Sequence, residues 1–415
     1  MSVNLASMAW RNLWRNKRRT IVTLSSIAFG ILLAVLFTGM GDDSWTKAID
    51  LAARMGSGHV TIMHPDYLEA PSLKKTITNV KAKRELASKA ADIEQTVTRI
   101  LGQTMLATAN GSYGALFIAY DPAEEDVATF ALLDADVLAE GAMFESANDK
   151  GIILGRKLAD NLDTKLGRKV VYTMTDKNGE IVSDLARVKG IIKTGSSMDA
   201  AICLLPLGRV RDNLGYGPDE SLQIAVFLAD HRDSDAVASS LMTSLDAKAV
   251  ALPWHKVSPD LAAFIAMKVG GTVFLEIIIL ILVAAGIFNT LFVSVMERMR
   301  EFGIMMAIGF SPSRLFRLVM WESLWLACVG LISSAAITAG PYYYYHTHGM
   351  DFTKMMGGGS AEIAGVALDP IFYVTIFPES AFYICLAVMI ATLVSGLYPA
   401  WRAGRVVPVE TIKLV

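Results

Sequence analysis

A dense group of charged residues, Glu297-Arg298-Met299-Arg300-Glu301, follows a long apolar run that begins near Val269. On a helical wheel the charged residues occupy one arc, and Met299, Phe302 and Met306 share the opposite face. This pattern predicts a short helix that is anchored by its apolar side and docks a soluble partner through its charged side. The alternative is a solvated loop whose charges only follow the positive-inside rule.

The other residues with chemical potential form no recognisable catalytic or metal site. His59 and His64, and separately His346 and His348, are candidate metal ligands, but His346-Thr347-His348 has no cysteine or carboxylate at metal-ligand spacing, and single exposed histidines are commoner than metal sites. The three cysteines fit no zinc or redox motif. Neither a Gly-x4-Gly-Lys-Ser/Thr phosphate loop nor a nucleophile elbow occurs. We therefore predict a non-catalytic chain that binds no metal and uses ATP only through a partner.

The composition indicates a mixture of membrane-spanning and soluble parts. Of 415 residues, 53% are hydrophobic and 19% are charged, and the mean hydropathy is +0.43. These values lie between those of a soluble globular protein and of a fully embedded transporter. A net charge of -2 gives no field that favours nucleic acid as a partner.

Four apolar runs are long enough to cross a bilayer. The first, residues 20–41, is uncharged, and at ~1.5 Å per residue it spans roughly 33 Å. Basic residues and Trp10 and Trp14 in the segment 1–19 are typical of an amphipathic helix on an anionic membrane surface. A cleaved signal peptide is the alternative, but the run exceeds the usual ~7–15 residues, which favours an uncleaved span. The other spans are predicted over 269–296, 313–340 and 379–400.

Residues 42–268 are predicted to form an α+β domain between the first and second spans. The sequence does not indicate where a boundary between subdomains would lie. Asn110-Gly111 and Asn178-Gly179 predict hairpin turns. Strands are expected at Gly58–Met63 and Ser221–Leu228, and helices at Lys81–Ala91, Ile153–Leu162, Leu207–Leu214 and Ser234–Leu245. The predicted fold class is a membrane protein with four transmembrane α-helices and a large extracytoplasmic α+β domain between helices 1 and 2.

Basic residues in the short flanking segments predict the orientation. They gather in segment 1–19, in the elbow 297–312 and in the tail 401–415, whereas the loop 341–378 has only Lys354. Both termini and the elbow are therefore predicted to be cytoplasmic, with the large domain outside.

Polar residues within the spans call for partners. Glu276 lies near the outer end of its span, where snorkelling or pairing is favoured over a proton relay. Asn289 is expected to bond a neighbouring helix, and Glu322 to pair with Arg314 or Arg317 near the inner surface. Small residues recur at i+4 in all four spans, which predicts close helix packing.

Three motifs resemble those of the MacB/LolCE/FtsX-like permeases of ABC transporters. They are Glu297-Arg298-x-Arg300-Glu301-x-Gly303-Ile304-x-x-Ala307-Ile308-Gly309, then Ala9-Trp10-Arg11-Asn12-Leu13 with Arg18-Arg19-Thr20, and Gly396-x-x-Pro399-Ala400-x-x-Ala403 with Pro408-Val409-Glu410. The order of spans and domain also matches, so the resemblance covers essentially the whole chain. Within the family, segments 58–62, 153–159 and 190–195 are most similar to the lipoprotein-releasing LolC/LolE subgroup.

The resemblance implies a type VII, mechanotransmission complex in the bacterial inner membrane. It would contain two permease chains, the same or paralogous, and two ABC ATPase subunits that bind ATP and Mg²⁺, while this chain binds no cofactor. Stalks at Asp42–Met55 and Ser258–Lys268 would carry motion to the periplasmic domain. The implied task is to extract lipoproteins or similar amphiphiles from membrane lipid toward a periplasmic carrier. Export of a peptide or antibiotic, and signalling to a periplasmic hydrolase, remain open.

The resemblance also assigns residues to two roles. The residues expected to contact the ATPase are Glu297, Arg298, Arg300, Glu301, Gly303, Ile304, Ala307 and Gly309. Candidates for contact with acyl chains of the cargo are Phe29, Leu33, Leu36, Phe274, Ile278 and Leu282. Plain lipid-facing or packing roles are an equal alternative for this second set.

Overall fold

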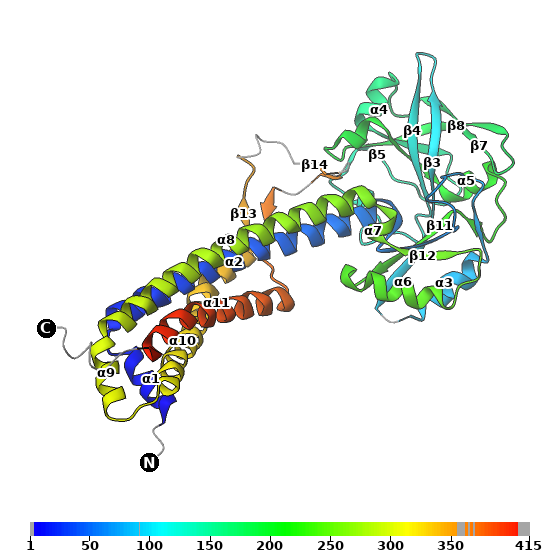
Figure 1. The fold of residues 1–415 in the computed structure, drawn as a ribbon. Helices are drawn as coiled ribbons and strands as arrows, with labels where there is room; N and C mark the ends of the chain where they lie inside the picture. Colours follow the sequence, from blue (N-terminus) through cyan, green and yellow to red (C-terminus); the bar gives the residue numbers. More distant parts are fainter. Residues whose placement is uncertain (1–3, 91, 355–361, 364–365, 368–369, 406–415) are drawn as a thin grey trace. The chain divides into compact units, whose positions relative to one another are not determined.

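The computed structural model describes residues 4–90, 92–354, 362–363, 366–367 and 370–405 (Figure 1). The chain divides into two compact units, and each is described here by itself. The first unit comprises Met1–Ser44, Ala266–Asp351 and Ile371–Val415, and the second comprises Trp45–Ile265 and Phe352–Pro370. The predicted tail motif Pro408-Val409-Glu410 and part of the predicted loop 341–378 lie outside the described residues.

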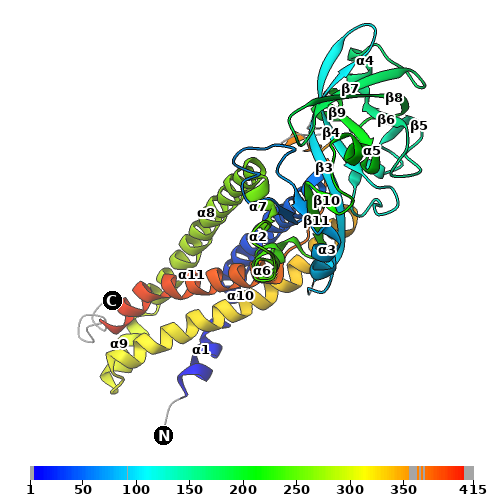
Figure 2. The same cartoon turned by 90° about the vertical axis from the view of Figure 1, so that its right-hand side faces the viewer.

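The first unit is helical (Figures 1 and 2). Among the described residues, four helices are long and apolar enough to cross a membrane. Each contains one of the predicted spans, so the predicted fold class is confirmed. The helices of this unit, two of which continue into the second unit, are α1 (Leu5–Leu13), α2 (Lys17–Ala52), α8 (Pro259–Glu297), α9 (Met299–Ala307), α10 (Pro312–His348) and α11 (Pro378–Gly404).

Two helices continue through prolines that lie near the predicted ends of their spans. Helix α10 continues through Pro341 to His348, and α11 continues through Pro399 to Gly404. A proline removes one backbone hydrogen bond, which packed helices tolerate when their neighbours hold them in place. Helix α10 ends instead at Gly349, whose φ of 68° suits glycine and breaks the helical repeat.

Small residues bring the four long helices together. An added Cβ at Gly30 of α2 would lie 2.4 Å from Val283 of α8, and one at Gly396 of α11 would lie 2.2 Å from Ser323 of α10. The predicted close packing is therefore present at these positions, whereas Gly286 of α8 faces open space. The apolar centre of the bundle consists of Ile27, Ile31, Val283, Ile287, Leu291, Leu326 and Val388.

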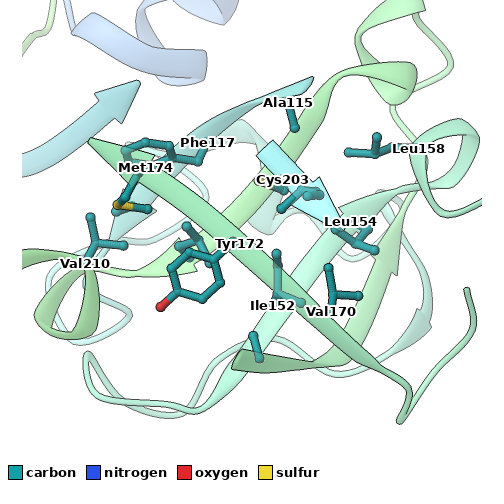
Figure 3. Close-up of a cluster of buried hydrophobic side chains, with 14 of the residues drawn as sticks. Ala115, Phe117, Ile152, Leu154, Leu158, Val170, Tyr172, Met174, Cys203 and Val210 are labelled. Atoms are coloured by element: carbon teal, nitrogen blue, oxygen red, sulfur yellow. The ribbon is translucent and has the colours of Figure 1, made fainter. Parts of the chain in front are cut away.

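The second unit is built on one mixed sheet in which six strands close into a ring. The pairing runs β3–β4–β9–β6–β8–β7 and returns to β3. Its interior holds the largest buried apolar cluster, including Phe117, Leu154, Tyr172 and Cys203 (Figure 3). The ring strands are β3 (Ile93–Ala107), β4 (Ser112–Tyr120), β6 (Gly151–Gly155), β7 (Lys169–Thr175), β8 (Ile181–Ile192) and β9 (Ile202–Pro206).

The long strand β3 also belongs to a second layer. Its first half pairs with β11 (Gln223–Leu228), which continues the sheet through β1 (Val60–Met63) and β12 (Val250–Pro253). Helices α3 (Val80–Ser88) and α6 (Ser234–Met242) contribute to a separate apolar core with these strands. The unit therefore has two lobes that share β3, a division that the sequence pattern did not reveal.

Most predicted elements of this unit are present at their expected positions. Strands β1 and β11 and helices α3 and α6 match, as does α5 (Leu207–Asn213). The helix predicted over Ile153–Leu162 is wrong in its first part, because residues 153–155 complete strand β6 and helix α4 covers only Arg156–Asn161. A short apolar run fits a buried strand and a buried helix equally well, and the fully buried β6 lies between β8 and β9.

Candidate functional site

The charged segment after the second span forms the separate helix α9, as predicted. A break at Arg298 divides it from α8, and the helix ends near Ile308. The next residue, Gly309, has a φ of 102°, a conformation that favours glycine. The N–H of Phe310 donates to the carbonyl oxygen of Met305 at 3.0 Å, which closes the turn into α10. Chain geometry therefore fixes a short helix between two long ones.

One face of α9 is buried. Phe302 is fully buried, and it packs with Leu315 and Val319 of α10 and with Ala400 and Ala403 of α11. Met299 and Met306 pack against the same cluster, so the predicted apolar face is confirmed. Gly303 is also buried, which places it on the anchored side of the helix.

The opposite face of α9 is exposed and partly apolar. Arg300, Ile304, Ala307 and Ile308 are exposed there, and Ile304 and Ile308 keep 48% and 73% of their surface open. Residues four apart lie side by side on a helix, so these two isoleucines form one apolar strip with Arg300 above it. An exposed apolar strip between charged residues is typical of a surface that binds another protein. Gly309, at the end of the helix, is also exposed.

Arg298 lies away from this exposed face and faces the helical unit's interior. Its side chain is 13% exposed, and its Nη1 donates to Oε1 of Glu322 in α10 at 2.9 Å. The side chain of Asn12 in α1 donates to the same oxygen at 2.8 Å. The predicted pairing of Glu322 with Arg314 or Arg317 is therefore wrong. Both of those arginines point to the exposed side of α10, whereas Glu322 lies on its buried side.

The acidic residues around α9 are held by the basic residues that precede the first span. Arg15 donates to Glu301 at 2.9 Å, and Arg19 donates to Glu297 at 2.6 Å. The Arg15 guanidinium, helped by Arg298, holds the pKa of Glu301 below its ordinary value. The start of α2 is thus tied to the end of α8, the turn behind α1 is tied to α9, and α10 is tied to Arg298 at the start of α9.

Helix α1 also packs on α10 through aromatic residues. The ring centroids of Trp10 and Trp325 are 5.1 Å apart, and the indole N–H of Trp325 donates to the carbonyl oxygen of Ala6 at 3.0 Å. The roles of Asn12, Arg15, Arg19 and Glu322 in bracing α9 were missed. The basic residues before the span were not predicted to form ion pairs within the chain, because no local pattern links positions some 300 residues apart.

The candidate cargo residues lie on α2 and α8. Phe29, Phe274, Ile278 and Leu282 are exposed, while Leu33 and Leu36 are half-buried. The apolar window of α8 is 11% buried, against 44% for that of α10. This exposure fits contact with lipid, with a second chain or with an acyl chain.

The other polar residues singled out have structural partners or face outward. Glu276 accepts a hydrogen bond from Thr38 of α2, which is the pairing expected of it. Asn289 is exposed, and its side chain makes no hydrogen bond within the described part of the chain, so its predicted helix partner is not found there. His59 contacts Asp50 at 3.0 Å, and His346 contacts the carbonyl oxygen of Val374 at 3.1 Å.

Four apolar helices, an α+β domain inserted after the first and a braced surface helix after the second define a transporter permease. Two family models match this layout. The MacB-like periplasmic core domain matches residues 20–243, and the FtsX-like permease C-terminal domain matches residues 273–408. The chain belongs to the MacB/FtsX-like family of ABC transporter permeases.

Curated relatives carry the names of several branches of this family. An ABC transporter permease YtrF of Bacillus subtilis is 28% identical over 201 residues, which are 48% of this chain and 41% of the relative. A lipoprotein-releasing transmembrane protein LolC of Xylella fastidiosa is 21% identical over 63% of this chain and 64% of its own length. A macrolide export protein MacB of Nitrobacter winogradskyi is 22% identical over 98% of this chain and 60% of its own length.

These matches cover between 41% and 64% of the relatives' lengths. Lipoprotein-releasing and macrolide-export proteins occur among them at nearly equal identity. The comparisons therefore support the family, and they leave the predicted LolC/LolE subgroup unresolved.

Proposed function

We propose that this chain is the membrane subunit of an ABC transporter and couples ATP hydrolysis by a separate ATPase chain to movement of its periplasmic domain. The observation that supports this most is helix α9, which is buried on one face and open on the other. Arg300, Ile304, Ala307 and Ile308 form the open face. We call these four residues the coupling face.

The bracing of α9 would transmit a force applied to the coupling face. A displacement of α9 moves Phe302 against α10 and α11. It also pulls on the Arg15–Glu301 ion pair and on the Arg298–Glu322 ion pair. Close-packed interiors and ion-paired networks shift as units, because deforming them costs free energy at many contacts together. Partner binding at this face would therefore change the arrangement of several helices at once.

Helices α2 and α8 would carry the movement onward. Neither helix is interrupted where its apolar window ends, since α2 reaches Ala52 and α8 already begins at Pro259. Ile49 of α2 packs with Leu261 and Ile265 of α8 at the domain end. An unbroken helix transmits displacement along its axis better than a flexible linker does. We propose that ATP and Mg²⁺ bind to the partner, and that two permease chains assemble with two ATPase chains.

The cargo that we propose is a lipoprotein or a similar amphiphile in the bacterial inner membrane, with both termini of this chain in the cytoplasm. The broad exposed apolar surface of α8, including Phe274 and Leu282, favours a cargo with a hydrocarbon part that reaches the protein from the lipid. Export of a macrolide-like compound is the second candidate, because the MacB relative aligns over nearly the whole of this chain.

The test is to place a carboxylate on the coupling face. Ile304→Asp and Ile308→Asp, made together, should abolish co-purification with the ATPase subunit and its stimulation, because a desolvated unpaired charge costs far more than the apolar contact contributes. Leu185→Asp is the matched control, since Leu185 is 43% exposed in the other unit. Normal association and normal ATP turnover by the Ile304→Asp/Ile308→Asp variant would refute the proposed coupling.

A further inference from the structure

The ring of strands in the second unit has an incomplete seam. Strand β3 pairs with β11 up to Arg99 and with β7 only from Met105 onward. Residues 100–104, which lie between these two paired stretches of β3, pair with neither β11 nor β7. The segment from Tyr67 to Lys74 covers part of this gap, and the Cδ2 atom of Leu73 lies 3.0 Å from the position that a Cβ of Gly102 would take.

Two adjoining cavities lie along this seam. One has a volume of about 670 Å³ and the other of about 510 Å³, and both are lined by Gln103, Leu116 and Thr175. The larger volume falls within the ~300–1,000 Å³ that is usual for small-molecule sites. The two cavities share these walls, and we refer to them together as the seam groove.

The walls of the seam groove are apolar and open to solvent. Leu116 is 48% exposed, Met105 is 49% exposed and Ile181 is 78% exposed. The ring has its own filled core on the other side of these strands, so these residues are not needed to complete that core. Met55 and Met198 also line the groove, and flexible methionine side chains adapt to ligands of variable shape.

One exposed cation lies at the rim of the groove. Lys74 is exposed, and no carboxylate of the described residues lies within ion-pair distance of it. The carboxylate of Asp176, which also lines the groove, is occupied by the backbone N–H groups of Asn178 and Glu180, each at 2.8 Å. The neighbouring Lys177 is paired with Glu220. Asp176 keeps its negative charge but is almost fully buried, so the exposed charge at the rim that has no ion-pair partner among the described residues is the positive charge of Lys74.

We propose that the seam groove binds the hydrocarbon chain of an anionic amphiphile, and that Lys74 pairs with its head group. Two adjoining apolar cavities with one exposed cation at their edge complement a molecule with a flexible apolar chain and one negative end. The inference rests on the proposed function only where it treats this ligand as cargo. Binding of the amphiphile is measured without any ATPase, so a failure to bind it can be distinguished from a failure of the coupling face to bind the ATPase.

The experiment labels the full chain in lipid nanodiscs with a hexadecanoate that carries a photoreactive diazirine near the chain end. Adducts are mapped by peptide mass spectrometry. We expect them in residues 71–74 and 101–118. Leu116→Glu should lower this labelling about tenfold, because a carboxylate in the groove repels the chain and the head group. Leu185→Glu, at similar exposure on another part of the ring, should leave it unchanged.

The charge of the head group is tested separately. Lys74→Glu should weaken labelling by the hexadecanoate several-fold and should not weaken labelling by a probe of equal chain length with a trimethylammonium head. Met105→Glu serves as a second groove variant, and thermal melts confirm that each variant is folded.

Three results would overturn the proposal. The first is labelling that Leu116→Glu and Met105→Glu leave unchanged while both variants are folded. The second is equal labelling by the anionic and the cationic probe in the unaltered chain. The third is cross-linking of the groove to a second copy of the chain, with no lipid adduct.

Discussion

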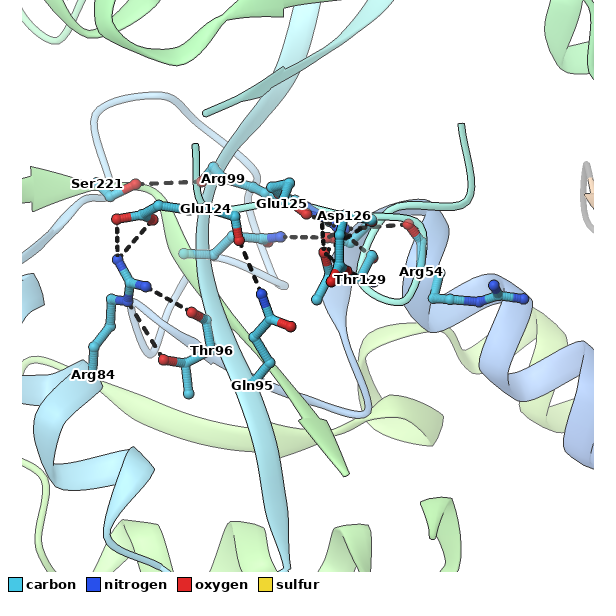
Figure 4. A network of polar contacts seen from close by, with 12 residues as sticks. Arg54, Arg84, Gln95, Thr96, Arg99, Glu124, Glu125, Asp126, Thr129 and Ser221 are labelled. Carbon is cyan, nitrogen blue, oxygen red and sulfur yellow. Dashed lines mark hydrogen bonds and ion pairs between the residues drawn. The ribbon is translucent and has the colours of Figure 1, made fainter. Parts of the chain in front are cut away.

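Two arginine-centred networks, one in each unit, differ in how far they are closed to solvent. Arg99 in β3 and Glu125 both have fully buried side chains, joined by two hydrogen bonds of 2.7 Å (Figure 4). Arg298 in the helical unit is 13% exposed, while its partner Glu301 is 34% exposed and Arg15 is 61% exposed. The first network is sealed, and the second opens toward solvent.

The sealed network satisfies its donors from several segments of one unit. Arg99 also donates to the carbonyl oxygens of Gly56 at 2.9 Å and of Thr129 at 2.6 Å, and it lies over the ring of Phe130. Gly56 belongs to the π-helical turn Ala53–Ser57 that follows α2. The turn, β3 and the loop near Thr129 are therefore fixed to one another.

The comparison indicates that the two networks have different tasks. A fully desolvated charge pair holds one arrangement, because any opening leaves an unpaired charge in an apolar environment. A partly hydrated pair can rearrange at lower cost, since water replaces the lost contacts. The sealed network suits a rigid joint, and the open network suits a helix that responds to a partner. The following predictions break or sharpen this contrast.

The largest effect is expected from opening the sealed network. Arg99→Met leaves Glu125 buried without a partner, which should destabilise the second unit by about 3–5 kcal/mol. Denaturant unfolding of the purified chain measures this loss. Adding Glu125→Leu should restore a large part of it, because the unpaired charge is then removed. A small loss in the Arg99→Met variant would show that this network is not the rigid joint described.

A smaller loss is expected in the open network. Glu322→Leu removes the acceptor shared by Arg298 and Asn12, and should cost about 1–3 kcal/mol. Hydrogen exchange should become faster in α1 and α9 and stay unchanged in the second unit. Arg317→Leu is the control, because Arg317 is exposed on the same helix. Equal exchange in the two variants would contradict the bracing of α9.

A third network, centred on Asp184 in the second unit, predicts that the stability of the chain depends on pH. Hydrogen bonds from Arg209, Asn213 and Tyr172 hold the pKa of Asp184 well below its usual range against the opposing effect of burial. The ionised Asp184 therefore stabilises the folded chain above the pKa of ~3.9 that the group has in the unfolded chain. This stabilisation is lost as the pH falls toward the lower pKa of the group in the folded chain. The melting temperature of the unaltered chain should fall more steeply below about pH 4 than that of Asp184→Asn. Parallel pH profiles would rule this out.

The smallest effect is expected at the most exposed pair. Arg15→Ala removes the ion pair with Glu301, and it should leave the stability almost unchanged because solvent screens such pairs. Stimulation of the ATPase should nevertheless fall, since one brace of α9 is lost. Arg11→Ala, which alters a nearby exposed arginine of α1, is the control for charge alone. Unchanged stimulation of the ATPase by the Arg15→Ala variant would show that the Arg15–Glu301 ion pair does not contribute to coupling.

The sequence predicts those features that local periodicity determines. The four spans could be predicted because a helix that crosses a bilayer needs a long apolar run. The buried face of α9 could be predicted because Met299, Phe302 and Met306 recur at helical spacing. The contact of Asn12 with Glu322 joins residues 310 positions apart, and the closure of the ring joins β3 to β7. Such pairings depend on the whole fold, so no local pattern contains them.

Arg298 points inward and Gly303 is buried, so these two residues of the predicted coupling motif do not lie on the exposed face of α9. Both belong to the motif by type and spacing, yet the first braces α9 and the second packs beneath it. Only the three-dimensional structure separates the residues that hold the helix from those that a partner can touch.

The most direct measurement is disulfide cross-linking between α9 and the ATPase subunit. Cysteines replace Ile304, Ile308 or Met306 one at a time, in a chain whose Cys328 and Cys385 are changed to serine, and are paired with a cysteine scan of the ATPase. Cross-links should form from Ile304 and Ile308, and none should form from Met306, which packs inward. Cross-links from Met306, or none from the two isoleucines in a complex with normal ATP turnover, would contradict the account.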